Sequence, residues 1–249
     1  MSTFINKKVI PYILAGYPNL KTTQTLLRHC HALGLTFIEL GIPFSDPSAD
    51  GPVIQAAASI ASRSFDFTTL YQLLKQLKSE GLRFEFTMMT YANPLFVSGA
   101  ENTLKRYSEV GVKGLLIPDI PFEERHFIDS LFKEKPPIQN VWMISENLSD
   151  KELSTIVKHS HYYLYLVSYL GTTGKSVDST ETLKTVIHKV KAIKDIDVAV
   201  GFGIRSKADA ENILKFADGA IIGTQIITRL NEGTDKACDL LKTLSDNAS

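Results

Sequence analysis

The chain has 249 residues, 27 basic and 27 acidic, and 44% of its residues are apolar, as in an ordinary globular protein. Balanced charge without a basic cluster argues against nucleic acid or an anionic membrane as the main partner. No apolar run approaches the ~20 residues of a membrane-spanning helix, and the N-terminus lacks a signal-peptide core. The two cysteines, Cys30 and Cys238, form no ligand motif, so we expect buried thiols in a cytoplasmic protein.

Eight short apolar runs follow one another at fairly even intervals and read as strands. They are residues 9–16, 37–43, 84–91, 114–119, 140–145, 162–168, 196–203 and 219–224. Strands that alternate with helices are typical of a parallel sheet, and the count of eight predicts closure into a (β/α)8 TIM barrel. We expect this α/β barrel to be a single domain over residues 1–249.

Amphipathic stretches with apolar residues three and four apart separate these runs and predict helices. Asn19, Ser149 and Ser206 are suited to cap three of them, because their side chains can accept hydrogen bonds from free amides at a helix start. The predicted helices cover residues 20–33, 68–77, 104–110, 122–132, 150–157, 180–193 and 208–216, with a last outer helix at 234–244.

The stretch FIELGIPFSDPSADGPVIQ, residues 37–55, carries two carboxylates of interest. Period-two alternation puts Glu39 on the opposite side of its strand from Ile38 and Leu40, on an otherwise apolar element. Burial alone can raise a carboxyl pKa by up to ~3 to 5 units, which would let Glu39 exchange protons near neutrality. Asp50 lies in the following turn-rich loop. Taken singly, Glu39 is more often ion-paired and Asp50 more often a turn or cap residue.

The positions of Glu39 and Asp50 in the predicted barrel favour a catalytic role over a structural one. The working residues of a (β/α)8 barrel come from the carboxyl ends of the strands and the loops after them. This rule places Glu39, Asp50, Tyr91, Asp119 and Tyr165 on one rim. The glycines of the GFG and IIGT segments fall on the same rim. We therefore expect the two carboxylates to face one cavity.

Glycine-bearing loops after strands six, seven and eight predict a phosphate site. They are residues 171–174, 201–206 and 222–225. Barrels frequently bind phosphate after their last two strands, where glycine lets backbone amides approach an anion. Arg205 could add positive charge, and is about as often a solvated surface residue.

Other chemistries are disfavoured. The histidines lack metal-ligand spacing, no GxSxG elbow precedes a helix, and no lysine falls at a strand end as a Schiff-base aldolase needs. We expect no metal. Acid and base catalysis by carboxylates on a phosphorylated small molecule remains. A sugar-phosphate isomerase would be another such barrel, but it would need its base at a different strand end.

Six motifs, in this order and at these intervals, resemble the tryptophan synthase α-subunit family from Pro11 to about Leu230: ELGIPFSDPSADGPVIQ, YANPLF, PDIPFEE, YLYLVSYLGTTG, GFGI and IIGTQII. The resemblance implies a (β/α)8 barrel that cleaves indole-3-glycerol phosphate to indole and glyceraldehyde 3-phosphate in tryptophan biosynthesis. It also implies an αββα heterotetramer with a β subunit. No cofactor is expected in this chain, and pyridoxal phosphate is expected on the β subunit.

The resemblance also assigns roles to residues. Glu39 matches the general acid and base, Asp50 the carboxylate that engages the indole N–H, and Tyr165 a tyrosine near the reacting centre. The implied substrate-binding positions further include Tyr91, Leu116, Met143, Thr173 and Ile222. The implied phosphate-binding positions are Gly174, Gly203, Gly223 and Thr224. The implied β-subunit contacts are Asp46, Pro47 and Pro121.

The chain departs from the family pattern in places. Tyr169 and Leu170 replace the usual residues in the loop that closes over substrate, so an alternative is an α-type subunit with weakened turnover that mainly activates its β subunit. Ile60, Phe65 and the pair at 145–146 are also unusual. Only ten residues precede Pro11, where the family has a longer helix, so we expect the amino-terminal end of the barrel to be less well filled.

Overall fold

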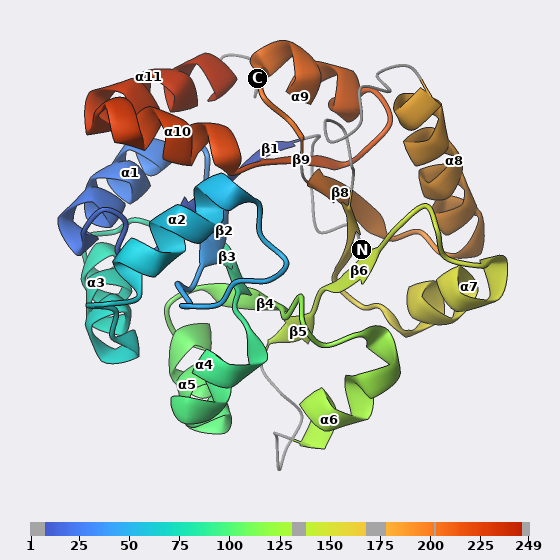
Figure 1. The fold of residues 1–249 in the computed structure, drawn as a ribbon, viewed down its shortest axis with the longest axis horizontal. Coiled ribbons are helices and arrows are strands. Elements are labelled where there is room, and N and C mark those ends of the chain that lie inside the picture. The colour runs from blue at the N-terminus through green and yellow to red at the C-terminus, as the bar shows by residue number, and fades with distance from the viewer. Residues whose placement is uncertain (1–7, 131–137, 168–177, 202, 246–249) are drawn as a thin grey trace.

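A computed structural model describes residues 8–130, 138–167, 178–201 and 203–245. Figure 1 looks into a central ring of strands that helices surround. All strand pairings in this part of the chain are parallel. The strands are β1 (Lys8–Leu14), β2 (Phe37–Gly41), β3 (Glu85–Met89), β4 (Val112–Leu116), β5 (Gln139–Asn140), β6 (Trp142–Ile144), β7 (Tyr163–Val167), β8 (Asp197–Gly201) and β9 (Gly219–Ile222).

The sheet closes through β5 and β6. The strand order is β5-β4-β3-β2-β1-β9-β8-β7-β6, so the two ends of the sheet are the two halves of one chain segment. The first half pairs with β4 and the second with β7. Between the halves, the Val141 amide donates to the Leu115 carbonyl at 2.8 Å. The predicted eight-stranded barrel is therefore confirmed, with its fifth strand divided in two.

Helices cover the outside of the barrel. They are α1 (Leu20–Ala32), α2 (Pro52–Ala61), α3 (Phe67–Ser79), α4 (Ala92–Val97), α5 (Ala100–Ser108), the 3-10 turn η1 (Phe122–Glu124), α6 (Arg125–Ser130), α7 (Asp150–His159), α8 (Asp178–Ile193), α9 (Lys207–Leu214), α10 (Thr224–Glu232) and α11 (Thr234–Ser245).

Helices α2, α4 and α10 were not predicted from the sequence. In α2, PVIQAAASIA, only Gln55 and Ser59 are polar, so its amphipathic pattern is faint, and α4 has only six residues. All three lie between a predicted strand and the next predicted helix, where we expected loops. They add helical structure at the rim that carries the predicted site.

The three predicted helix caps are confirmed. Asn19 accepts a hydrogen bond from the Thr22 amide at the start of α1. Ser149 and Ser206 form capping boxes, in which the cap and the third helical residue each bond the other's backbone. These caps satisfy amides that the helices leave free, and so fix where α1, α7 and α9 begin.

Strand register determines which side chains point into the barrel. Tyr12, Glu39 and Thr87 are neighbours across β1, β2 and β3, so they share one inward layer. At the amino-terminal end, the rings of Phe37 and Tyr162 stack with centroids 6.4 Å apart, and Tyr163 donates to Thr87 Oγ1 at 3.0 Å. Among the described residues, aromatic rings thus occupy the end that we expected to be less well filled.

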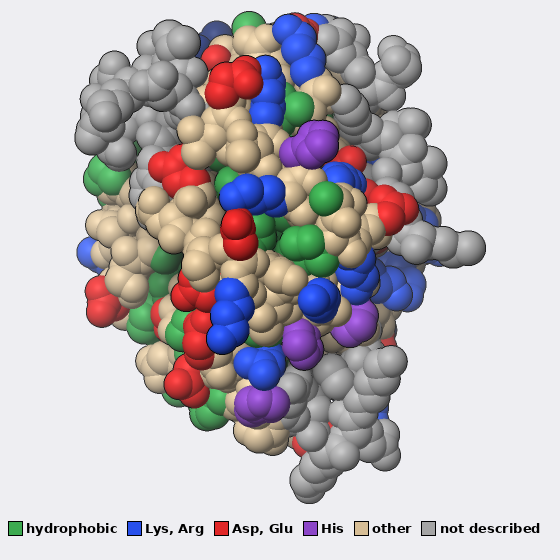
Figure 2. Space-filling view, turned by 90° about the vertical axis from the view of Figure 1, so that its right-hand side faces the viewer, with side chains coloured by type: hydrophobic (Ala, Val, Ile, Leu, Met, Phe, Trp, Pro, Cys, Tyr) green, Lys and Arg blue, Asp and Glu red, His purple; other side chains and the backbone are tan. Residues whose placement is uncertain are grey.

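The face over α7 and α8 carries both signs of charge. Figure 2 shows Lys and Arg side chains interspersed with Asp and Glu there. Two of the pairs are Lys189 with Asp150 at 2.7 Å and Lys184 with Glu181 at 2.6 Å. Within the described ranges, every helix is too short or too polar to cross a membrane.

Candidate active site

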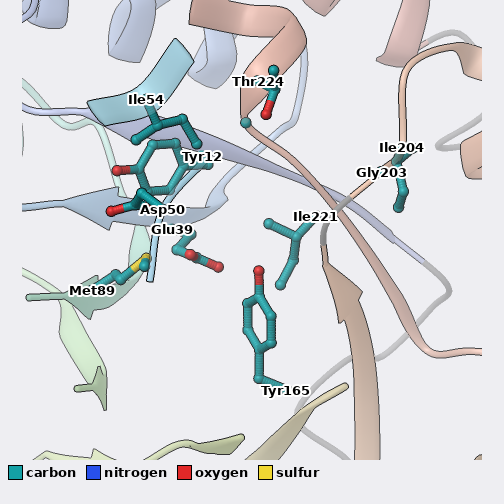
Figure 3. Close-up of a pocket in the computed structure, with 11 residues that line it drawn as sticks. Tyr12, Glu39, Asp50, Ile54, Met89, Tyr165, Gly203, Ile204, Ile221 and Thr224 are labelled. Carbon is teal, nitrogen blue, oxygen red and sulfur yellow. The ribbon is translucent and has the colours of Figure 1, made fainter. Parts of the chain in front are cut away.

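A cavity opens at the carboxyl ends of the strands. It has about 400 Å³ of space free of protein atoms, part of it open to solvent. Figure 3 shows the side chains that converge on it from several strands and loops. The lining residues are Tyr12, Glu39, Asp50, Ile54, Met89, Tyr165, Gly203, Ile204, Ile221, Gly223 and Thr224.

Glu39 is a buried carboxyl group in this cavity. It is 1% exposed, and its Oε2 atom has no hydrogen-bond partner among the described residues. The ion pairs found in this part of the chain do not include Glu39. Burial, with a smaller contribution from the charge of Asp50, raises the Glu39 pKa to about 8. The group is therefore mostly protonated at neutral pH and free to act on a ligand.

Asp50 lies in the loop between β2 and α2, and hydrogen bonds hold it. The Tyr91 hydroxyl donates to Asp50 Oδ2 at 2.9 Å, and the Gln55 side-chain amide donates to the Asp50 carbonyl at 2.8 Å. Burial raises the Asp50 pKa to about 6, against the lowering effect of the Tyr91 hydrogen bond. Asp50 is therefore mostly ionised at neutral pH while Glu39 is mostly protonated, so the two carboxyl groups are suited to different roles.

Two glycines make room for tyrosine hydroxyls beside the carboxylates. A side chain at Gly41 would overlap the Tyr12 hydroxyl, and one at Gly201 would overlap the Tyr165 hydroxyl. In Figure 3 the Glu39 carboxylate and the Tyr165 hydroxyl both point into the middle of the cavity. Burial raises the pKa of both tyrosines, so they remain neutral and can donate hydrogen bonds.

The opposite end of the cavity offers backbone amides. Gly203, with φ of 78°, and Gly223 line it together with Thr224, the first residue of α10. Gly223 is the N-cap and provides no side-chain cap, so the first amides of α10 are free for an anion. Arg205 is exposed and does not line the cavity. Thr173 and Gly174 lie outside the described residues.

Several predicted substrate positions lie near the cavity without lining it. Leu116 is the neighbour of Met89 across β4 and β3, and Met143 is the neighbour of Tyr165 across β6 and β7. Ile222 follows the lining residue Ile221, and strand alternation turns it to the other face of β9. Their proposed contacts with substrate remain predictions.

The sequence analysis did not select five lining residues. Tyr12 and Met89 could have been found by extending period-two alternation from Glu39 to the neighbouring strands, and Ile221 by applying it along β9. Ile54 and Ile204 come from α2 and the loop after β8, whose places relative to the cavity have no local signal.

The predicted partner contacts lie on the same rim. Asp46 and Pro121 are exposed, whereas Pro47 is buried. They follow β2 and β4, the two strands on either side of β3. Asp119 accepts a hydrogen bond from the Ala92 amide at 3.0 Å, at the start of α4.

The fold and the site together define a (β/α)8-barrel enzyme with a pair of carboxyl groups at one end of its cavity and free amides at the other. A family model described as "Tryptophan synthase alpha chain" matches residues 4–249. The chain belongs to this family, whose members are lyases that cleave indole-3-glycerol phosphate in tryptophan biosynthesis. The family works with a β subunit and needs no cofactor in the α chain itself.

Individual relatives support the same family membership. The chain is 35% identical to the tryptophan synthase alpha chain of Petrotoga mobilis over 238 residues, which cover 95% of this chain and 92% of the relative. It is similar to the solved alpha subunit from Campylobacter jejuni, with a TM-score of 0.86, 28% identity and 97% of each chain covered. It also resembles a tryptophan synthase structure from M. tuberculosis, with a TM-score of 0.83, 26% identity, and 96% of this chain and 92% of that one covered.

Proposed function

We propose that Glu39 and Asp50 carry out the retro-aldol cleavage of indole-3-glycerol phosphate in this chain. The reaction breaks the bond between indole C3 and the C3' carbon of the side chain. It moves one proton from the C3' hydroxyl to indole C3, and the products are indole and glyceraldehyde 3-phosphate. Protons balance without any other reactant, so one group that can give and accept a proton suffices.

Glu39 fits that group. Its pKa of about 8 keeps a proton available at neutral pH, and its Oε2 atom has no partner among the described residues. Protonated Glu39 can deliver its proton to indole C3, and the resulting carboxylate can accept the proton of the C3' hydroxyl as the aldehyde forms. The unpartnered buried carboxyl group in the cavity is the observation that carries this assignment.

Asp50 fits the stabilising role. Protonation at C3 gives the ring nitrogen positive charge, and a nearby carboxylate stabilises that charge while accepting the N–H hydrogen bond. The pKa of about 6 keeps Asp50 mostly ionised at neutral pH. Gly203, Gly223 and Thr224 at the other end of the cavity would hold the phosphate.

Release of indole from indole-3-glycerol phosphate tests this assignment. Glu39→Gln keeps the size of the side chain but removes its ability to exchange a proton. In an assay that contains the β subunit, this variant should lower kcat by at least about 100-fold. Asp50→Asn should also lower kcat strongly. The matched control is Glu181→Gln, which changes an exposed, ion-paired carboxylate on α8. Wild-type turnover in Glu39→Gln, with an unchanged circular dichroism spectrum, would remove Glu39 from the mechanism.

The alternative of a mainly activating subunit rested on Tyr169 and Leu170, which lie outside the described residues. Both carboxyl groups line the cavity and have different pKa values, which supports catalysis by this chain. Measuring indole release together with stimulation of the β reaction distinguishes the two functions, because a pure activator would stimulate without cleaving.

We further propose that this chain forms an αββα heterotetramer in the cytoplasm, with pyridoxal phosphate on the β subunit. An exposed apolar patch supports the proposal that a partner binds this chain. The rings of Phe96 and Phe127 lie 5.0 Å apart and are 37% and 43% exposed, and Val97 beside them is 81% exposed. The patch follows β3 and β4, on the rim that also carries Asp46 and Pro121.

A further inference from the structure

The hydroxyl group of Tyr91 makes two hydrogen bonds to the loop after β2. It donates to Asp50 Oδ2 at 2.9 Å and accepts from the Ala49 amide at 3.0 Å. Tyr91 is 3% exposed, whereas Ala49 and Asp50 are half-buried, so both bonds are partly shielded from water. The two partners are consecutive residues, more than 40 positions away in sequence. One hydroxyl therefore fixes both the Asp50 carboxylate and the backbone just before it.

Tyr91 is itself held on two sides. Its ring packs against Phe44, with centroids 5.4 Å apart, in the same loop as Asp50. It is also the N-cap residue of α4, and the next amide, that of Ala92, donates to Asp119 at 3.0 Å. Its position is therefore tied to α4, the helix that carries the exposed side chains of Phe96 and Val97.

We propose that Tyr91 is a positioning residue, which holds the Asp50 carboxylate at the cavity and links it to the partner-facing helix α4. This inference rests on the proposed function, because it assumes that Asp50 acts in catalysis. It differs from direct substrate binding, the role that the family resemblance implied for Tyr91 and that remains a prediction. The cavity lining agrees, because it includes Asp50 but not Tyr91.

Removal of the hydroxyl has a defined electrostatic consequence. The titratable groups facing Asp50 are Tyr12 from β1, Glu39 from β2, Tyr165 from β7 and Tyr91 itself. Among these, the Tyr91 hydrogen bond lowers the Asp50 pKa and opposes the effect of burial. Without that donor the Asp50 pKa rises above about 6, so Asp50 becomes ionised only at higher pH.

The test is the pH dependence of kcat/KM for indole release in Tyr91→Phe. We expect the acid limb, which reports ionisation of Asp50 in the free enzyme, to move to higher pH by about one unit. At neutral pH kcat/KM should fall by roughly 10-fold or more, as expected for a lost hydrogen bond to a charged group. It should partly recover as the pH rises toward the Glu39 pKa of about 8, above which the proton donor itself is lost.

The matched control is Tyr107→Phe. The Tyr107 hydroxyl is also buried and donates to the Phe67 carbonyl at 2.7 Å, on the outer helices. This variant loses a comparable hydrogen bond and should keep the wild-type pH profile. An unchanged acid limb in Tyr91→Phe, or the same shift in both variants, would overturn the positioning role.

The link to α4 predicts a second result. At saturating β subunit, the factor by which the partner stimulates indole release should be smaller in Tyr91→Phe than in wild type. An unchanged stimulation factor would overturn the link to α4.

Asp50→Asn separates this inference from the proposed function. If Asp50→Asn keeps wild-type turnover, the proposed function fails. If Asp50→Asn is inactive while Tyr91→Phe behaves as wild type, only the role of Tyr91 fails.

Discussion

Glu39 combines a catalytic advantage with a cost in stability. Its side chain is 1% exposed and its folded-state pKa is about 8, against an ordinary value of 4.5 for a glutamate in an unfolded chain. Between these two pH values the folded state binds more protons than the unfolded state, so the free energy of unfolding falls as pH rises. The contribution of a protonated Glu39 is fully present below about pH 4.5 and is lost by about pH 8.

Glu39→Gln should therefore stabilise the protein at neutral and alkaline pH. A neutral amide of similar size avoids the cost of the buried charge, at most roughly 5 kcal/mol from the shift in pKa. Urea unfolding at pH 5, 7 and 8.5 measures the effect, with Glu181→Gln as the exposed control. A stability difference from wild type that is the same at all three pH values would contradict the raised pKa.

Helix α10 is the element that connects the fold to the proposed phosphate site. It begins with Thr224 at the cavity, directly after the N-cap residue Gly223, which offers no side chain to cap the first amides. Its apolar residues Ile226 and Ile227 are fully buried, which anchors the helix against the barrel. The amides of its first turn are therefore held in place before any ligand arrives.

Thr224→Val removes a hydroxyl at the proposed phosphate site and keeps the shape of the side chain. We expect KM for indole-3-glycerol phosphate to rise by about 10-fold, with kcat nearly unchanged, because the phosphate is remote from the bond that breaks. The control is Thr155→Val on α7, whose hydroxyl donates to the Lys151 carbonyl at 2.8 Å. A change in kcat with constant KM would place Thr224 at the reacting centre instead.

At the scale of the whole molecule, three neighbouring strands bring the parts of the proposed partner interface together. β2, β3 and β4 are adjacent, so the loop with Asp46, helix α4 with Phe96, and the segment from Pro121 to Phe127 lie side by side on one rim (Figure 1). Asp50 belongs to the first of these loops. A partner that covers this rim would therefore also contact the loop that carries a proposed catalytic residue.

Phe96→Asp should weaken binding of the β subunit. A charge in the middle of an apolar patch opposes burial, and we expect Kd to rise by at least about 10-fold. Turnover of the isolated chain should change little, since Phe96 does not line the cavity. Thr243→Asp on α11, an exposed position on a helix that lies at the top of Figure 1 while α4 and α6 lie at the bottom, is the control. Equal affinity of Phe96→Asp and wild type would exclude the patch from the interface.

Much of the fold was predictable because local chemistry determines it. Alternating apolar runs and amphipathic stretches predicted the eight strands, and Ser149 and Ser206 marked helix starts through hydrogen bonds within one turn. The division of the fifth strand at Val141 was not predictable, because it depends on pairing with β4 on one side and β7 on the other.

The candidate site shows the same limit. The sequence by itself determined the alternation of strands and helices and the period-two orientation of Glu39, since these follow from neighbours along the chain. Glu39 and Asp50 were chosen because they lie at and after a predicted strand end and match the family motif. Only the tertiary structure decided that Glu39 has no ion-pair partner in the described part of the chain, that Tyr91 bonds to Asp50, and that Ile221 lines the cavity. The physical reason is that pKa values, hydrogen bonds and cavity walls depend on groups brought together from distant parts of the chain by barrel closure.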